Sequence, residues 1–237
     1  MSLPKINTPE YKLNIPSTDE EINYRPFLVK EEKLLLIAQE TGDERAQYRA
    51  IQNLIKSCVK EDLAVDKLPM FDLEYIFLNI RAKSVGEIAK LNLTCPDDEK
   101  TKVDYELDLT KVNVQMDEKH SPRIQLTDKI GVLMSYPTMD LIEQYAVTGT
   151  ENAANQLFKM VSNCIYQIWE GEEVHEVQDY GEKEIMEFLD SLNHEQFEKL
   201  NSFFETMPTL KHDITITNPN TNVTSTITLK GIQNFFE

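Results

Sequence analysis

The sequence predicts an α+β protein: a helical body with a small antiparallel β-rich middle section and a C-terminal β-hairpin. Apolar residues recur at helical spacing over residues 30–84 and again over 138–207. They alternate with polar residues over 85–136, as in half-buried strands. Within residues 210–237, two more alternating runs flank the turn sequence Asn218-Pro-Asn-Thr-Asn222. We therefore expect helices, then a β-rich section, helices again, and a final hairpin with a short tail.

The prolines of residues 1–29 predict an extended N-terminal arm, followed by one domain over residues 30–237. Proline fixes φ and pushes the preceding residue towards extended geometry. Two alternatives remain for the arm: it is a strap over its own domain, or it docks on a neighbouring protein. Because such an arm has few internal hydrogen bonds, we expect the residues before about position 18 to add little stability.

Three helices are predicted in the first third. Residues 30–39 crowd five apolar side chains together, which predicts a largely buried helix. Asp43 is placed to cap the next helix, which runs to about residue 60. The third, over residues 71–84, has one apolar face that should lie in the core, and Gly86 offers a helix end.

Hydrophobic spacing also predicts the remaining elements. The expected strands cover residues 88–95, 103–109, 112–116, 123–126 and 131–136. The expected helices cover residues 138–147, 151–169, 182–191 and 194–207. Trp169, at the end of the longest of these helices, is expected to be a core anchor.

The charge excludes several function classes. With 41 acidic and 24 basic residues, the net charge is −17, which argues against binding to nucleic acid or to an anionic membrane. No apolar run is long enough to span a membrane, and the N-terminus has no apolar signal-peptide region. Cys58, Cys95 and Cys164 are widely spaced, which predicts reduced thiols in a cytoplasm.

No motif in the chain carries chemistry. The four histidines and three cysteines lack metal-ligand spacing, and neither a glycine-rich phosphate loop nor a G-x-S-x-G elbow occurs. We therefore expect no enzyme activity, no cofactor and no metal site. Aromatic and arginine side chains, which dominate interface hot spots, gather near the chain ends. The predicted partner-binding residues are Tyr11, Ile15, Tyr24, Arg25, Phe27, Phe235 and Phe236.

Four segments, in one order along the chain, carry a family resemblance. They are YRPFLVKEEKLLL at 24–36, FDLEYIFLNIRAKSVGE at 71–87, LKGIQNFF at 229–236 and, more weakly, IGVLMSYP at 130–137. Together they resemble the baseplate hub or hub assembly protein family of T-even-like tailed bacteriophages, the myoviruses. The resemblance names no catalytic residue.

The resemblance implies a non-enzymatic phage tail protein that acts in assembly of the baseplate hub. Its implied partners are baseplate hub or tail proteins, and it would act in the cytoplasm of the infected bacterium and in the virion baseplate. One alternative is a permanent structural subunit of the virion. A second is an acidic inhibitor or nucleic-acid mimic that binds a host protein, although the acidic residues are dispersed along the chain.

Overall fold

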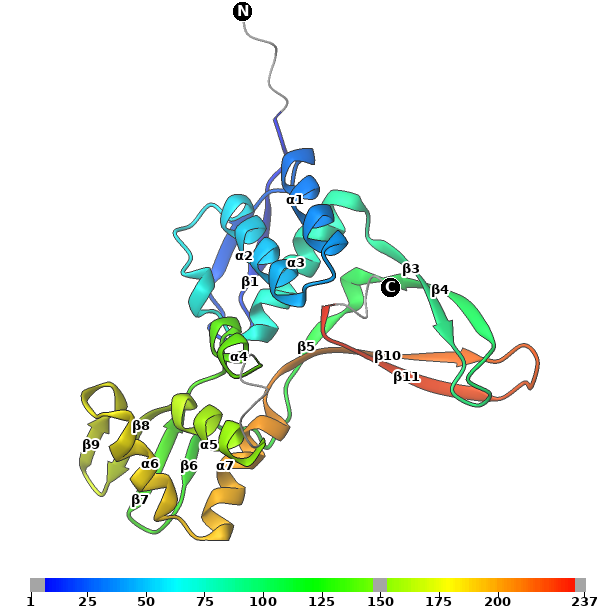
Figure 1. Ribbon diagram of the computed structural model, residues 1–237. Coiled ribbons are helices and arrows are strands. Elements are labelled where there is room, and N and C mark those ends of the chain that lie inside the picture. Colours follow the sequence, from blue (N-terminus) through cyan, green and yellow to red (C-terminus); the bar gives the residue numbers. More distant parts are fainter. Residues whose placement is uncertain (1–6, 147–152, 233–237) are drawn as a thin grey trace, which may run out of the picture. The chain divides into compact units, whose positions relative to one another are not determined.

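The computed structural model describes residues 7–146 and 153–232, and it confirms the α+β class (Figure 1). The chain forms two compact units. Unit 1 comprises Met1–Gln115 and Thr209–Glu237, and unit 2 comprises Met116–Pro208. This division differs from the expected single domain over residues 30–237. Periodicity marks individual elements, but it does not show which of them share a core.

Unit 1 contains three helices and three small antiparallel sheets in its described residues. Its strands pair in the orders β1-β2, β3-β4 and β11-β10-β5. The elements are β1 (Tyr11–Asn14), β2 (Glu21–Tyr24), α1 (Val29–Glu40), α2 (Glu44–Cys58), the 3₁₀ turn η1 (Val65–Lys67), α3 (Met70–Val85), β3 (Ile88–Thr94), β4 (Lys102–Asp108), the turn η2 (Leu109–Lys111), β5 (Asn113–Gln115), β10 (Thr209–Thr217) and β11 (Thr224–Lys230).

The centre of the unit 1 core is α3. Its Ile76 and Ile80 are fully buried, together with Ile55 of α2 and Ile22 of β2. The expected helix over residues 71–84 is confirmed, and so is the capping role of Asp43, whose Oδ1 accepts a hydrogen bond from Arg45 N at 3.0 Å. Nine residues of α3 are buried, so burial extends beyond the single apolar face expected for this helix.

The N-terminal segment is part of this core, as in the strap alternative. Strands β1 and β2 form a hairpin whose Ile15 and Ile22 are fully buried. Ser17, in the turn, donates its N–H to Asp72 Oδ1 of α3 at 3.1 Å and its hydroxyl to Asp72 Oδ2. These contacts argue against the expectation that the residues before about position 18 add little stability.

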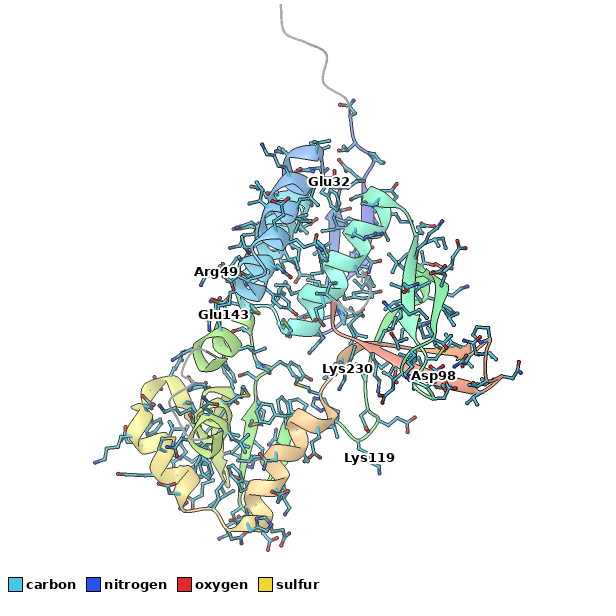
Figure 2. All side chains as sticks on the ribbon, turned by 45° about the vertical axis from the view of Figure 1, so that its right-hand side comes forward. Glu32, Arg49, Asp98, Lys119, Glu143 and Lys230 are labelled. Carbon is cyan, nitrogen blue, oxygen red and sulfur yellow. The ribbon has the colours of Figure 1, made fainter. Side chains whose placement is uncertain are left out.

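Two hairpins that are far apart in the sequence meet at their tips. Asn218, in the β10–β11 turn, donates its side-chain amide to both carboxylate oxygens of Asp97, each at 3.0 Å. Asn220 donates to Thr101 Oγ1 at 2.9 Å. Asp98, labelled in Figure 2, closes the β3–β4 turn by accepting the N–H of Thr101 at 2.9 Å. This polar junction fixes the two hairpins of unit 1 to each other.

Unit 2 packs helices on a four-stranded antiparallel sheet with the order β6-β7-β8-β9 (Figure 1). Its elements are β6 (Arg123–Gln125), β7 (Ile130–Met134), α4 (Met139–Ala146), α5 (Ala153–Cys164), β8 (Ile165–Glu170), β9 (Glu173–Glu176), the turn η3 (Val177–Asp179), α6 (Glu182–Asp190) and α7 (His194–Thr206). The core includes Val132, Val161, Leu189, Leu200 and Phe203.

The expected single helix over residues 151–169 is wrong over its last five residues, 165–169. Helix α5 ends at Cys164, and Ile165 begins β8, which pairs with β7 and β9. The apolar residues continue at helical spacing across this boundary, but pairing with two strands stabilises the extended conformation. Trp169 is buried, as expected for a core anchor, and lies opposite Gly131. A Cβ at position 131 would stand 2.1 Å from the Trp169 ring, so only glycine fits there.

Candidate protein-binding site

The outer face of α1 is an unusually apolar surface. Val29, Leu34, Leu36 and Ile37 are 79 %, 58 %, 54 % and 49 % exposed. The only fully buried residues of this helix are Glu31 and Ala38. The prediction that residues 30–39 form a largely buried helix is therefore wrong about burial, although the helix itself is present. Several large apolar side chains exposed on one helix mark a candidate interaction surface.

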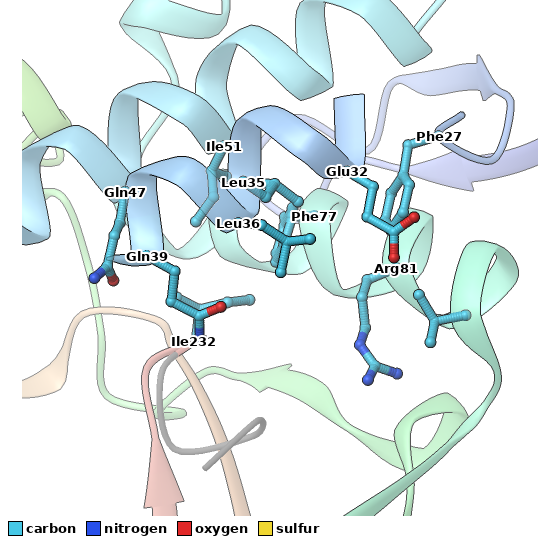
Figure 3. A pocket seen from close by; sticks show the side chains of 11 residues that line it. Phe27, Glu32, Leu35, Leu36, Gln39, Gln47, Ile51, Phe77, Arg81 and Ile232 are labelled. Atoms are coloured by element: carbon cyan, nitrogen blue, oxygen red, sulfur yellow. The ribbon is translucent and has the colours of Figure 1, made fainter. Parts of the chain in front are cut away.

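Beside this face lies an open groove of about 340 Å³, here called the α1 groove. Figure 3 shows its lining side chains, which come from α1, α2, α3 and the segment after β11. Its apolar lining consists of Phe27, Leu35, Leu36, Ile51, Phe77, Val85 and Ile232, and its polar lining of Glu32, Gln39, Gln47 and Arg81. A mostly apolar wall with a few polar groups is the usual composition of a binding pocket.

A polar anchor holds α1 in place. Glu31 is only 4 % exposed, and its carboxylate accepts hydrogen bonds from Arg25 Nη2 at 2.9 Å and from Leu28 N at 2.8 Å. Burial raises the pKa of Glu31, but these hydrogen bonds lower it, and the net pKa lies below its ordinary value. Arg25 also donates to Ser57 O of α2 at 2.9 Å. This charged network holds the first turn of α1 against the rest of unit 1. The exposed apolar side chains of α1 are therefore not needed to hold the helix there.

Backbone contacts to α3 fix two other parts of the groove. Phe27 donates its N–H to Ser84 Oγ at 2.9 Å. At the other side, Ile232 donates its N–H to Glu74 Oε1 at 3.1 Å. Glu74 is buried, and burial raises its pKa to about 7. Both groove residues are therefore tied to the most deeply buried helix of unit 1.

The predicted partner-binding residues lie in different environments: some are in the core, one holds α1 and one lines the α1 groove. Ile15 and Tyr24 are core residues, and Tyr11 is half-buried with its ring 5.7 Å from that of Tyr24. Arg25 belongs to the network that holds α1. Phe27 lines the α1 groove. Phe235 and Phe236 lie outside the described residues.

Leu34, Leu36 and Ile37 were not predicted to be surface residues. One signal could have found them: the apolar residues of 30–39 do not form a single stripe, so one helix face cannot bury them all.

The groove offers contact area and shape rather than chemistry. Over residues 7–146 and 153–232, no group of three or more His, Cys, Asp and Glu side chains could hold a metal ion. In the same residues, no helix is both long enough and apolar enough to cross a membrane. The exposed apolar residues of α1 and the apolar wall of the α1 groove are therefore the candidate contact surface of unit 1.

The comparison with protein families gives the particular class. The family model described as T4 bacteriophage base plate protein matches residues 8–237. The chain belongs to this family of phage baseplate proteins. Neither a curated protein nor a solved structure matches it.

Proposed function

We propose that this protein acts in assembly of the phage baseplate hub, and that it binds a neighbouring baseplate protein through the α1 groove and the exposed face of α1. Membership of the baseplate family supports binding to other baseplate proteins. The resemblance of residues 24–36 and 71–87 to hub proteins supports the hub as the place of action. Both segments contribute residues to the groove.

The single observation that carries the proposal is that apolar side chains of α1 are exposed to solvent. A helix with four largely exposed apolar side chains leaves a surface that water solvates poorly. Leu36 is one of these exposed residues and also lines the α1 groove. The exposed face of α1 therefore adjoins the groove. A partner helix or loop that covers this surface would bury it, as in helix-in-groove recognition.

The test is a double substitution, Leu36→Glu with Ile37→Glu, in a tagged chain expressed in infected cells. Each removed anchor should weaken binding by about 2 kcal/mol, so co-purification of identified baseplate proteins should fall at least about 100-fold. The matched control is Ile88→Glu with Val223→Glu, two residues of unit 1 with similar exposure that do not line the groove. Equal capture by both variants, with unchanged thermal melts, would refute the α1 groove as the binding site.

A second measurement separates an assembly factor from a permanent subunit. Mass spectrometry of purified mature tails should find the protein absent or substoichiometric if it acts only during assembly in the host cytoplasm. A fixed copy number relative to other baseplate proteins would instead identify a permanent structural subunit. The family is compatible with both roles.

A further inference from the structure

Unit 2 contains a second cavity, of about 450 Å³, between its sheet and α6. Ile130 of β7, Ile168 of β8, and Ile185 and Phe188 of α6 form its apolar lining. Its volume lies within the roughly 300–1,000 Å³ range of pockets that bind ligands. All its lining residues belong to unit 2, so it is independent of the α1 groove.

Carboxylates of one sign surround this apolar lining. Glu170 stands at the end of β8, and Glu184 and Glu187 stand one turn apart on α6. Among the residues that the structure describes, no lysine or arginine lines the cavity. Lys183 approaches Glu187 at 3.6 Å, but its side chain is 89 % exposed, so this pair is weak. We call the cavity the glutamate pocket.

The aromatic wall of the glutamate pocket is held in one orientation. The ring nitrogen His175 Nδ1 lies 2.7 Å from the Tyr180 hydroxyl, and the two rings meet edge to face with centroids 5.9 Å apart. Phe188 adds a second ring. The pocket therefore combines aliphatic, aromatic and anionic surfaces.

We propose that the glutamate pocket receives an arginine side chain of a protein partner. The three methylenes of arginine suit the isoleucine lining, as such stems lie on apolar surface while the charged head stays at the rim. The planar guanidinium stacks on aromatic rings and binds carboxylates through two parallel hydrogen bonds. Lysine can place its ammonium over a ring, but it cannot stack a planar group on it or bind a carboxylate through two parallel hydrogen bonds. The net charge of −17 also favours a partner with a basic surface.

This inference goes beyond the proposed function, because it gives the chain a second docking site on its other unit. A protein with an apolar groove on unit 1 and a charged pocket on unit 2 can hold two partners at once, or one partner at two points. Charge complementarity at the pocket adds specificity and speed of association, whereas the α1 groove supplies apolar contact area.

The test uses the full chain with ¹³C-labelled isoleucine methyl groups, assigned through Ile→Val variants at positions 130, 168 and 185. The probe is the blocked tripeptide acetyl-Gly-Arg-Gly-amide, titrated with NMR detection. We expect saturable shifts of these three methyl signals, with a Kd of roughly 1–10 mM for so small a ligand. The matched probes carry lysine or the uncharged isostere citrulline in place of arginine, and should bind at least about 10-fold more weakly.

Variants complete the test. Glu170→Gln with Glu184→Gln should weaken arginine-peptide binding at least about 10-fold, and glutamine at 184 can still accept the N–H of Gly181 that caps α6. The control, Glu195→Gln with Glu198→Gln, alters two carboxylates of α7 outside the pocket and should leave binding unchanged. Equal binding of citrulline and arginine, equal binding of lysine, or equal binding by both variants would each overturn the proposal.

Discussion

Helices α1 and α3 lie in the same unit, and neither has its apolar residues in a single stripe, yet their burial is opposite. Nine residues of α3 are buried, including the charged Asp72 and Glu74, whereas α1 buries only Glu31 and Ala38. In α3, most of the apolar residues are part of the core of unit 1. In α1, they face solvent and the α1 groove.

The difference teaches that an apolar helix without a single stripe has two possible meanings. Either the helix is buried in the core of its own chain, or its exposed apolar residues form a binding surface for another protein. Polar contacts decide between them here: the α3 carboxylates bind the N-terminal hairpin and Ile232, which cover that helix, while Glu31 holds α1 at its first turn. Predictions about the two helices should therefore differ in kind.

The largest effect separates burial in α3 from exposure in α1. Ile76→Asp places an unpaired charge at a fully buried site, at a cost comparable with the whole stability of about 5–15 kcal/mol. We expect an unfolded or insoluble protein. Ile37→Asp, at a half-exposed site, should change stability by less than about 1 kcal/mol. Urea unfolding of both variants checks this, and a soluble Ile76→Asp with a normal melt would break the comparison.

The next effect tests whether the N-terminal hairpin covers α3. Ile15→Ala should lower the free energy of unfolding by about 2–5 kcal/mol, because Ile15 is fully buried in the core around this helix. Val29→Ala, at the most exposed position of α1, should cost less than about 0.5 kcal/mol. Similar losses for the two, measured by chemical denaturation, would mean that the hairpin is not a structural strap.

A pH effect of about 3 kcal/mol is expected from Glu74. Burial raises its folded-state pKa from 4.5 to about 7. The folded state then retains a proton that the unfolded chain releases, so this stabilisation is full below about pH 4.5 and is lost as the pH rises through 7. Denaturation at pH 5 and pH 8 should show the loss in the native protein, and Glu74→Gln should reduce it.

Two features make this pH measurement specific. Burial also raises the pKa of Asp72, to about 6, so part of the pH dependence should remain in Glu74→Gln. Glu106→Gln is the control, because it removes one negative charge from an exposed strand position. The same reduction in both variants would attribute the effect to net charge rather than to the buried carboxyl group.

The smallest effect concerns the anchor of α1. Glu31→Ala removes a charged hydrogen-bond acceptor that holds Arg25 and the Leu28 N–H, and should cost about 1.5–3 kcal/mol. Glu40→Ala, at the end of the same helix, should cost well under 1 kcal/mol because its side chain is exposed. Hydrogen exchange in α1 should accelerate in the first variant only. Unchanged protection there would show that apolar contacts, not Glu31, hold the helix.

Local sequence patterns predicted the local structure well. The helices after Asp43 and before Gly86, and the hairpin around Asn218-Pro-Asn-Thr-Asn222, lie where the residues place them. The strands β1, β2 and β9 were not predicted, and β8 was predicted as helix although Ile165-Tyr-Gln-Ile-Trp169 followed by Gly171 carried a strand and turn signal. That signal was outweighed by the helical spacing that continues from Val161, because a single segment does not reveal its future strand partners.

The candidate site was much harder to predict. Aromatic residues near the chain ends suggested an interface, but Tyr24 and Ile15 fill the core, and only Phe27 lines the α1 groove. The exposure of Leu34 and Ile37 depends on which surfaces other segments cover. The glutamate pocket likewise joins Glu170 to α6, across a hairpin and a turn that sequence periodicity does not place together.

The insertion of unit 2 into unit 1 has a consequence for the order of synthesis. Residues 116–208 are synthesised before residue 209. Unit 2 can therefore complete its core while unit 1 still lacks β10 and β11. Val114 of β5 can pair with Leu210 only after β10 is synthesised. Glu74 can bind Ile232 only after a further stretch of chain, because the two are 158 residues apart. Ile232 also completes the wall of the α1 groove. A nascent or truncated chain therefore cannot present the finished groove, so partners that need it would engage only chains translated beyond residue 232.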